Sequence, residues 1–288
     1  MSALIINGKE LSANIELELS EQAAEIHSRI GRMPSLRVVL VGNNPASEVY
    51  VASKTKRARA CGLAVEDLRL PEDVTQPDLE ISLKALSIDK HVDGILLQLP
   101  LPKHLDELSA ILSIAPAKDV DGLNPYNQGL LFRGQARLVP CTPLGIIELI
   151  KDARRELYRD DNLSGLSATV IGRSSLVGKP VAMLLTQENC TVTLCHSKTE
   201  NLKAACVHSD IVVAAVGMPK LIKKDFIKTN AVVIDVGINR SADGKLIGDV
   251  DFDEVKEKAA AITPVPGGVG PMTIAMLIKN TLIAAGNQ

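Results

Sequence analysis

Aromatic side chains are scarce in this chain of 288 residues. It has three tyrosines, three phenylalanines and no tryptophan, although 46% of its residues are hydrophobic. Its hydrophobic cores must therefore be built from aliphatic side chains. At about 150 residues per domain, the length predicts two domains, and it is sufficient to bury sizeable cores.

Cysteine and net charge are also limited. The five cysteines are an odd number, and no two of them have C-x-x-C spacing. We therefore expect reduced thiols, without a disulfide framework or a metal cluster. The formal net charge of −2 offers no basic excess for nucleic acid. Small molecules or other copies of the chain are the expected partners.

Targeting signals and long hydrophobic runs are missing from the sequence. The N-terminus has neither the basic region nor the apolar segment of a secretory signal. The apolar runs, such as 211–216, are as long as a strand and far shorter than a membrane span. We expect a cytoplasmic protein that has no membrane partner.

Short apolar runs alternate with helical patterns along the chain. Most of the runs lack polar alternation, which predicts strands covered on both faces in a parallel sheet. They are 36–42, 92–100, 167–172, 190–195, 210–217 and 231–237. The helical patterns are 47–62, with Ser47 as its expected cap, 79–89, 105–114, 142–157, with Pro143 in its first turn, 177–188 and 272–286. This order predicts an α/β protein of βαβ units, with a domain break near 131–143.

One strand-to-helix turn carries a degenerate nucleotide motif. In ATVIGRSSLVGKP, residues 168–180, the small residues are Gly172, Ser174 and Gly178. A serine replaces the second glycine of G-x-G-x-x-G, and the last gap is one residue longer. The N-terminus of the following helix favours an anion, so the turn is a candidate pyrophosphate site. By itself, the pattern also fits an ordinary turn.

The next strand favours NADP over NAD. An acidic residue about 20 positions after the turn would bind the ribose 2′-hydroxyl of NAD. Here the strand is followed by His196, Ser197 and Lys198, with no acid. Together with Arg173, the histidine and serine would accept a 2′-phosphate. Taken singly, His196 fits a solvated loop and Arg173 fits a surface charge.

Polar residues in the first half of the chain form a second candidate site. Tyr50 and Lys54 lie four positions apart and share one face of the predicted helix. Gln98 ends an apolar strand, the place where open α/β sheets bind ligands. Asp121 follows in the segment KDVDG. Each of these features also has an ordinary structural explanation, such as a solvated lysine or an Asp-Gly turn.

Taken together, the motifs resemble one family. They are YVASK, GILLQLPLP, KDVDGL, PCTP, GRSSLVGKP, DVGIN and PVPGGVGPMT, in that order over essentially the whole chain. The sequence is thereby similar to the bifunctional methylenetetrahydrofolate dehydrogenase/methenyltetrahydrofolate cyclohydrolase family. The resemblance implies oxidation of methylenetetrahydrofolate by NADP+, followed by hydrolysis of the methenyl product to 10-formyltetrahydrofolate.

The resemblance also implies roles for individual residues. Lys54 would be the central catalytic residue, Tyr50 and Gln98 would orient it and the water, and Asp121 would hold the pterin. The implied NADP site comprises Gly172, Arg173, Ser174, Ser197 and Ile238, with His196 from the argument above. Pro264, Gly267 and Gly268, in a loop that otherwise reads as a plain turn, would lie near the folate.

The family fold sets the expected domain organisation. Residues 1–140 plus 271–288 would form an N-terminal α/β folate domain, and 141–270 a Rossmann-type NADP domain. Two long helices would join them, the last helix would return to the first domain, the active site would lie in the cleft, and the protein would be a homodimer. Two alternatives remain: a monofunctional NADP-dependent dehydrogenase, and a non-catalytic module that senses NADP.

Overall fold

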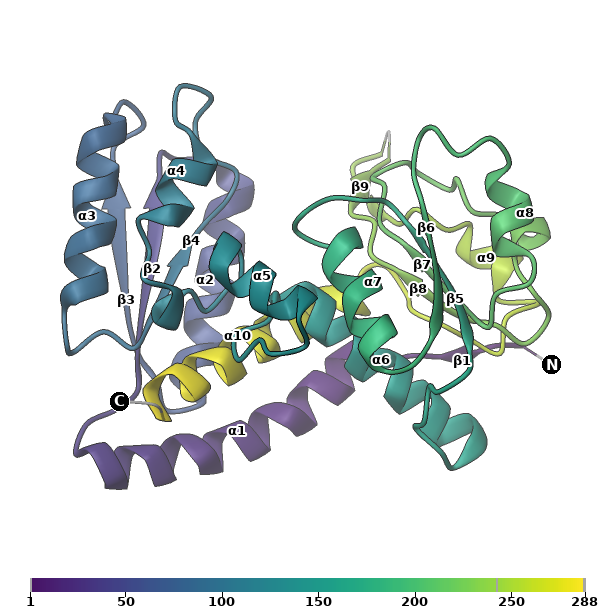
Figure 1. Cartoon of the computed structure of the whole chain (residues 1–288), viewed down its shortest axis with the longest axis horizontal. Coiled ribbons are helices and arrows are strands. Elements are labelled where there is room, and N and C mark those ends of the chain that lie inside the picture. The colour runs from purple at the N-terminus through teal and green to yellow at the C-terminus, as the bar shows by residue number, and fades with distance from the viewer. Residues whose placement is uncertain (1, 242, 287–288) are drawn as a thin grey trace. The chain divides into compact units, whose positions relative to one another are not determined.

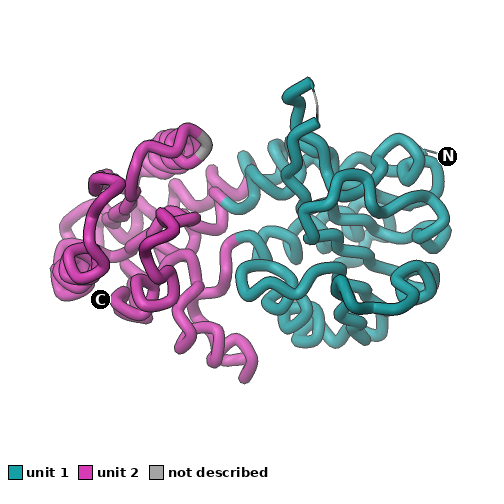
Figure 2. Tube along the Cα trace, turned by 90° about the horizontal axis from the view of Figure 1, so that it is seen from above, with its two compact units in different colours: residues 1–13, 142–273 teal, residues 14–141, 274–288 magenta. Residues whose placement is uncertain are grey.

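The chain folds into two compact units, each built around a parallel sheet (Figure 2). The computed structural model describes residues 2–241 and 243–286. Unit 1 consists of 1–13 and 142–273, and unit 2 of 14–141 and 274–288. The three junctions between these segments fall inside helices, so α1 (Gly8–Ile30), α6 (Cys141–Tyr158) and α10 (Val269–Gly286) each contribute residues to both units.

Unit 2 contains a three-stranded parallel sheet in the order β3-β2-β4 (Figure 1). The strands are β2 (Ser35–Val41), β3 (Ala64–Leu70) and β4 (Gly94–Leu97). Its helices are α2 (Pro45–Ala60), α3 (Gln76–Ile88), α4 (Glu107–Leu112), η1 (Pro116–Lys118) and α5 (Pro125–Phe132). Strands β2 and β4 coincide with predicted apolar runs. Strand β3 was not predicted, because its sequence AVEDLRL carries three charged residues at a sheet edge.

Unit 1 contains a six-stranded parallel sheet in the order β1-β11-β8-β7-β5-β6. The strands are β1 (Leu4–Ile5), β5 (Ser167–Ile171), β6 (Thr191–Cys195), β7 (Ile211–Ala214), β8 (Val232–Asp235) and β11 (Ala261–Ile262). The remaining elements are α7 (Gly178–Gln187), α8 (Leu202–Cys206), η2 (Lys224–Phe226), α9 (Phe252–Val255) and the antiparallel pair β9 (Asn239–Arg240) and β10 (Leu246–Ile247). The chain runs from β5 to β6 on one side and then returns to β7 on the other. This reversal makes the carboxyl ends of β5 and β7 the ligand-binding edge of such a sheet.

The predicted α/β class is confirmed, and so is the return of the last helix. Residues 274–286 of α10 belong to unit 2, where Arg29 donates a hydrogen bond to the Gly286 carbonyl (3.0 Å). The first thirteen residues differ from expectation. They belong to unit 1 because Leu4 pairs with Ala261 across β1 and β11. A two-residue strand is too short to leave a hydrophobic period in the sequence.

Two local predictions are refined by the structure. The run 190–195 forms a strand, as predicted, but β6 lies at the edge of the sheet and its Leu194 is 38% exposed, unlike the runs that are covered on both faces. Helix α2 begins at Pro45, earlier than expected, and the side chain of Asn44 accepts the Ser47 backbone N–H at 3.2 Å. Asn44, rather than Ser47, is therefore the residue that caps this helix.

The cores are aliphatic, as the scarcity of aromatic residues requires. Four of the six aromatic residues, Tyr50, Tyr126, Phe132 and Tyr158, are among the exposed hydrophobic side chains. The largest fully buried side chains are all leucine or isoleucine: Leu36, Leu40, Leu79, Leu83, Ile95, Leu96, Ile146, Leu149, Ile150, Leu163, Ile171 and Leu185.

Helix α10 is the most hydrophobic helix of the fold. In the part of the chain that the structure describes, it is the one helix long and apolar enough to cross a membrane by length and composition. The structure buries 67% of it, as is typical of a core helix.

Candidate functional site

Lys54 and Gln98 are brought together in unit 2. The side chain of Lys54 is only 9% exposed, and its Nζ donates a hydrogen bond to Gln98 Oε1 at 3.0 Å. Gln98 directly follows β4, and its Nε2 donates to the Leu99 carbonyl at 2.6 Å. Because the amide nitrogen is bound to that carbonyl, the amide oxygen faces Lys54. The structure thus supplies a nearly buried amino group held by an oriented amide.

Tyr50 and Asp121 occupy different environments. Tyr50 lies one helical turn before Lys54 on α2 and is 42% exposed. Asp121 stands in a tight turn, in which the Gly122 N–H donates to the Asp119 carbonyl at 3.1 Å. Gly122 has φ = 69°, and a Cβ there would press on the backbone of Val139 and Pro140. The turn therefore accounts for the Asp-Gly pair in the sequence. Asp121 is still a candidate site residue, because the turn uses only the backbone of this segment.

Cys141 lies beside Asp121, and the sequence analysis assigned it no role. Its thiol is buried and donates its one proton to the Val120 carbonyl at 3.2 Å, and it is close enough to Asp121 to be affected by that residue's charge. Burial, and then the negative charge of Asp121, raise the pKa of this thiol well above its ordinary value, whereas the charge of Lys54 lowers it. The thiol is therefore a neutral donor close to both Asp121 and Lys54. Its position in the motif PCTP was the one signal available in the sequence.

Asn280, also missed by the sequence analysis, joins the same region from α10. It is fully buried, and its Nδ2 donates to the carbonyls of Val120 and Val139, each at 2.8 Å. These carbonyls precede Asp121 and Cys141 respectively along the chain. Asn280 therefore ties together the two backbone segments that carry them.

The tight backbone of the predicted dinucleotide turn depends on its two glycines. Gly172 directly follows β5 and has φ = 115°, and a Cβ on it would overlap the carbonyl of Ala215, which directly follows β7. A Cβ on Gly178 would overlap the Gly172 carbonyl. Side chains at these two positions would therefore disrupt the turn, so the structure requires both glycines that the motif retains.

Ser174 organises the N-terminus of α7. Its Oγ accepts the N–H groups of Val177 (3.1 Å) and Gly178 (3.3 Å). The hydroxyl proton remains available as a donor, which suits an anion at this helix end. Arg173 is exposed beside it.

The predicted 2′-phosphate residues follow β6. His196 is half-buried, and its Nδ1 accepts the Lys198 N–H at 3.1 Å, which assigns the ring proton to Nε2. Ser197 is exposed, and no carboxylate stands in this loop between His196 and Thr199. After β8, the side chain of Ile238 is 54% exposed. The first acid after β6 is Glu200, at the far end of the loop. A closed turn, a helix N-terminus and a stretch without carboxylates directly after β6 therefore fit a 2′-phosphorylated dinucleotide.

The loop with the predicted folate contacts precedes α10. The Gly268 N–H donates to the Pro264 carbonyl at 3.0 Å, and Gly267 has φ = 113°. A Cβ on Gly8, at the start of α1, would overlap the Gly268 carbonyl. The loop is thus a tight turn packed against the first residues of the chain.

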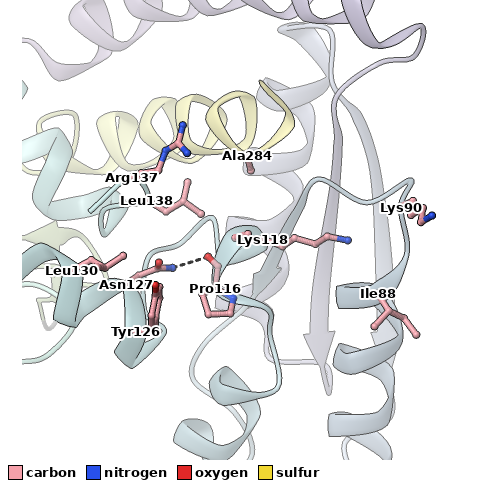
Figure 3. A pocket seen from close by; sticks show the side chains of 11 residues that line it. Ile88, Lys90, Pro116, Lys118, Tyr126, Asn127, Leu130, Arg137, Leu138 and Ala284 are labelled. Atoms are coloured by element: carbon pink, nitrogen blue, oxygen red, sulfur yellow. Dashed lines mark hydrogen bonds between the residues drawn. The ribbon is translucent and has the colours of Figure 1, made fainter. Parts of the chain in front are cut away.

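Unit 2 also has a pocket of about 600 Å³ that is lined by none of the predicted site residues (Figure 3). One of its three cationic residues, Lys118, already donates to the carbonyls of Leu86 and Asp89, and Asn127 donates to the Pro116 carbonyl at 2.9 Å. The lining consists of Ile88, Lys90, Pro116, Ala117, Lys118, Tyr126, Asn127, Leu130, Arg137, Leu138 and Ala284. Within residues 2–241 and 243–286, no group of three His, Cys, Asp or Glu side chains is placed to hold a metal ion.

The fold and these side chains define an α/β protein with a dinucleotide-binding sheet and a second unit that carries a buried lysine and an oriented amide. Two family profiles match the chain: tetrahydrofolate dehydrogenase/cyclohydrolase, NAD(P)-binding domain, over residues 140–288, and the catalytic domain of the same description over residues 6–121. The chain belongs to the tetrahydrofolate dehydrogenase/cyclohydrolase family, which confirms the resemblance seen in its motifs.

Similar proteins match over nearly their whole length. The bifunctional protein FolD of Dichelobacter nodosus is 52% identical over 288 residues, with 99% of this chain and 97% of the relative covered. The structure of the bifunctional FolD dehydrogenase/cyclohydrolase of Campylobacter jejuni has a TM-score of 0.94 and 44% identity, covering 99% of each chain. The structure of the FolD enzyme of Trypanosoma brucei, complexed with NADP cofactor and an inhibitor, has a TM-score of 0.92 and 39% identity, covering 100% of this chain and 98% of that one.

Proposed function

We propose that this protein oxidises 5,10-methylenetetrahydrofolate with NADP+ and then hydrolyses the 5,10-methenyltetrahydrofolate to 10-formyltetrahydrofolate. The observation that carries the proposal is the hydrogen bond from the nearly buried Lys54 to Gln98, in a chain of this family. A dehydrogenase alone would need no proton relay, so this pair favours the bifunctional enzyme.

The first step needs mainly proximity. When bound, NADP+ supplies the hydride acceptor. The nitrogen atoms beside the one-carbon bridge stabilise the cation that hydride loss leaves, so the protein has to hold the reactants rather than transfer protons. We assign cofactor binding to Gly172, Arg173, Ser174, His196, Ser197 and Ile238. The closed turn at Gly172 and the lack of a carboxylate in residues 196–199, directly after β6, support this assignment.

The second step needs proton transfer. Water adds to the methenyl carbon and loses a proton, which leaves a hydroxyl on that carbon. A proton then reaches the pterin nitrogen, its bond to the carbon breaks, and the hydroxyl loses its proton to give the formyl group, so that one proton is released overall. We assign the relay of the proton from the water to this nitrogen to the Lys54 amino group, which accepts a proton only in its neutral form. Gln98 holds Lys54 in place through its Oε1. General acid–base catalysis of this kind contributes typically about 10²–10⁴-fold.

The remaining residues would bind and orient the folate. We assign Asp121 to the pterin through a charge-assisted hydrogen bond, supported by its place beside Lys54 and Cys141. Tyr50 would orient Lys54 and the water from the same face of α2. Pro264, Gly267 and Gly268 would contribute backbone, since their tight turn lets a ligand approach closely.

We further propose that the enzyme is a cytoplasmic homodimer. The five cysteines are all buried and free, as suits a reducing compartment. Because the formal net charge is only −2, electrostatic repulsion between two copies of the chain is small.

One incubation tests the function and its two alternatives. The protein is mixed with methylenetetrahydrofolate and NADP+, and NADPH, methenyl and 10-formyl products are followed. All three signals are expected. Methenyl accumulation without faster hydrolysis than in buffer would instead identify a monofunctional dehydrogenase. Binding of NADP+ without any NADPH would identify the sensing module.

A further inference from the structure

Two buried aspartates lie under the loops at the carboxyl ends of β7, β8 and β11. Asp235 ends β8 and belongs to the motif DVGIN, and Asp249 follows β10. Both are almost completely buried, at 3% and 0% exposure. Of the residues that the structure describes, no lysine, arginine or histidine forms an ion pair with either one. Hydrogen-bond donors must therefore compensate their charges.

Asp249 binds the turn after β7. Its Oδ2 accepts the backbone N–H groups of Val216 (2.7 Å) and Gly217 (3.0 Å), and its Oδ1 accepts Nδ2 of Asn239 (2.9 Å). The residue before Val216 is Ala215, whose carbonyl packs against Gly172. Asp249 thus holds the backbone on which the dinucleotide turn rests.

Asp235 binds the loop that contains Asp249. Its Oδ1 accepts the N–H groups of Gly237 (3.0 Å) and Asp249 (2.9 Å), and its Oδ2 accepts that of Val250 (3.0 Å). Its own N–H donates to Thr263 Oγ1 at 2.7 Å. The segments that follow β7, β8, β10 and β11 are therefore connected in one hydrogen-bond network around the two carboxylates.

Glycine is required where backbone meets these carboxylates. A Cβ on Gly237 would overlap the Asp249 carboxylate, and one on Gly248 would overlap that of Asp235. Between the tethered Gly237 and Asn239 stands Ile238, with its side chain more than half exposed. The network therefore fixes the backbone on both sides of a predicted cofactor contact.

We propose that Asp249 and Asp235 are positioning residues of the cofactor site. Asp249 sets the turn 216–217 that supports Gly172, and the two aspartates together set the backbone that presents Ile238. This inference rests on the proposed binding of NADP+ by unit 1. Asp235 acts through backbone N–H groups, and Asp249 through backbone N–H groups and the side chain of Asn239; neither is assigned a contact with the substrate.

A carboxylate is needed here because it only accepts hydrogen bonds. Asp249 uses both oxygens for three donors. An amide in its place has one oxygen, so its NH₂ group must face either the backbone N–H groups of Val216 and Gly217 or Asn239, whose own amide would have to turn its oxygen toward it. Asp249→Asn therefore disturbs these contacts while keeping the size of the side chain. In Asp235→Asn the donors are all backbone N–H groups, which cannot turn over.

Asp210 provides a matched control in the same sheet. It precedes β7 at the opposite, amino end of the strands, and its carboxylate accepts Ser167 N (2.9 Å) and Ser167 Oγ (2.8 Å). Asp210→Asn thus also disturbs an aspartate that holds backbone, but away from the loops of the cofactor site.

The test compares the full-length wild type, Asp249→Asn and Asp210→Asn, well below their melting temperatures. The NADP+ dissociation constant is measured by titration calorimetry, and amide hydrogen exchange of residues 215–217 and 237–239 by mass spectrometry. For Asp249→Asn we expect an NADP+ dissociation constant at least tenfold higher and faster exchange in both segments. Hydrolysis of methenyltetrahydrofolate without cofactor should stay within about twofold of wild type. Asp210→Asn should keep the NADP+ affinity.

Asp235→Asn is the second variant, in case Asp249→Asn does not fold, and the same weaker NADP+ binding is expected. Unchanged NADP+ affinity in a folded variant, or equal losses in Asp249→Asn and Asp210→Asn, would overturn the inference. A wild-type chain that does not bind NADP+ would overturn the proposed function and this inference with it. That outcome is recognised from the wild type alone, before any variant is compared.

Discussion

Asn280 and Cys141 are 139 residues apart in sequence, yet their side chains meet inside unit 2, with Asn280 Nδ2 3.5 Å from Cys141 Sγ. The same Nδ2 donates to the carbonyls of Val120 and Val139. One buried amide of the last helix thus connects the backbone before Asp121 with that before Cys141.

Asn280→Ala is expected to destabilise the protein and weaken folate binding. It removes the Asn280 donor from the buried carbonyl of Val120, which keeps only the Cys141 thiol, and from the half-buried carbonyl of Val139, at about 1–3 kcal/mol for each such group. Denaturant unfolding should show a loss of roughly 2–4 kcal/mol, and the KM for methylenetetrahydrofolate should rise more than kcat falls. The control is Thr281→Val, because Thr281 Oγ1 donates only within α10, to Leu277. Equal changes in the two variants would contradict a specific role for Asn280.

Lys54→Met should separate the two activities. It removes the proposed proton relay, so hydrolysis of methenyltetrahydrofolate should fall by about 10²-fold or more, while hydride transfer falls far less. Methenyl absorbance and NADPH formation measure the two steps separately. Lys56→Met, at an exposed position of the same helix, should leave both rates near wild type. Equal losses in both steps for Lys54→Met would refute the assignment.

Arg173→Ala tests the preference for NADP+. Since the guanidinium is exposed beside the dinucleotide turn, its loss should raise the KM for NADP+ about tenfold and barely affect that for NAD+. Arg133→Ala removes the same charge from an exposed position of unit 2 and should change neither value. If NAD+ suffers as much as NADP+, Arg173 has a structural role instead.

Asp235 should make stability depend on pH. Its burial raises the pKa from 3.8 to about 6, against the opposing effect of the backbone N–H groups that it accepts. Between these two values the native protein keeps a proton that the unfolded chain releases. This group therefore stabilises the fold as pH falls from about 7 to 4, by roughly 3 kcal/mol, and that contribution is lost as pH rises through 6.

The measurement is the difference in unfolding free energy between wild type and Asp235→Asn across this pH range. The difference should favour the wild type progressively toward pH 4 and level off above pH 7. A difference that is flat, or that grows with pH, would show that Asp235 keeps an ordinary pKa.

The cysteines should resist alkylation in the native protein. Burial raises the pKa of the thiols of Cys61 and Cys190 to about 11, and of Cys206 to about 12. It also raises the pKa of Cys141 and Cys195. Because only the thiolate reacts, iodoacetamide at pH 7.5 should label the folded chain slowly, and all five positions should react in denaturant. Fast labelling of a single thiol in the native protein would identify a local opening around it.

The sequence by itself determined the α/β class, the position of most strands and the family. Buried parallel strands leave continuous apolar runs, and the glycines at 172 and 178 leave a recognisable turn because no larger residue fits there. The motif residues Lys54 and Gln98 could be named as candidates from their places on a helix face and at a strand end.

Only the tertiary structure decided which distant segments meet. Strand β1 joins the sheet of unit 1 through two residues, too few for any period, and β3 is a charged edge strand. Asn280 and Asp249 act through backbone groups that other parts of the chain bring to them. Such contacts depend on packing between residues far apart in sequence, and hydrophobic periodicity records only the local face that each element buries.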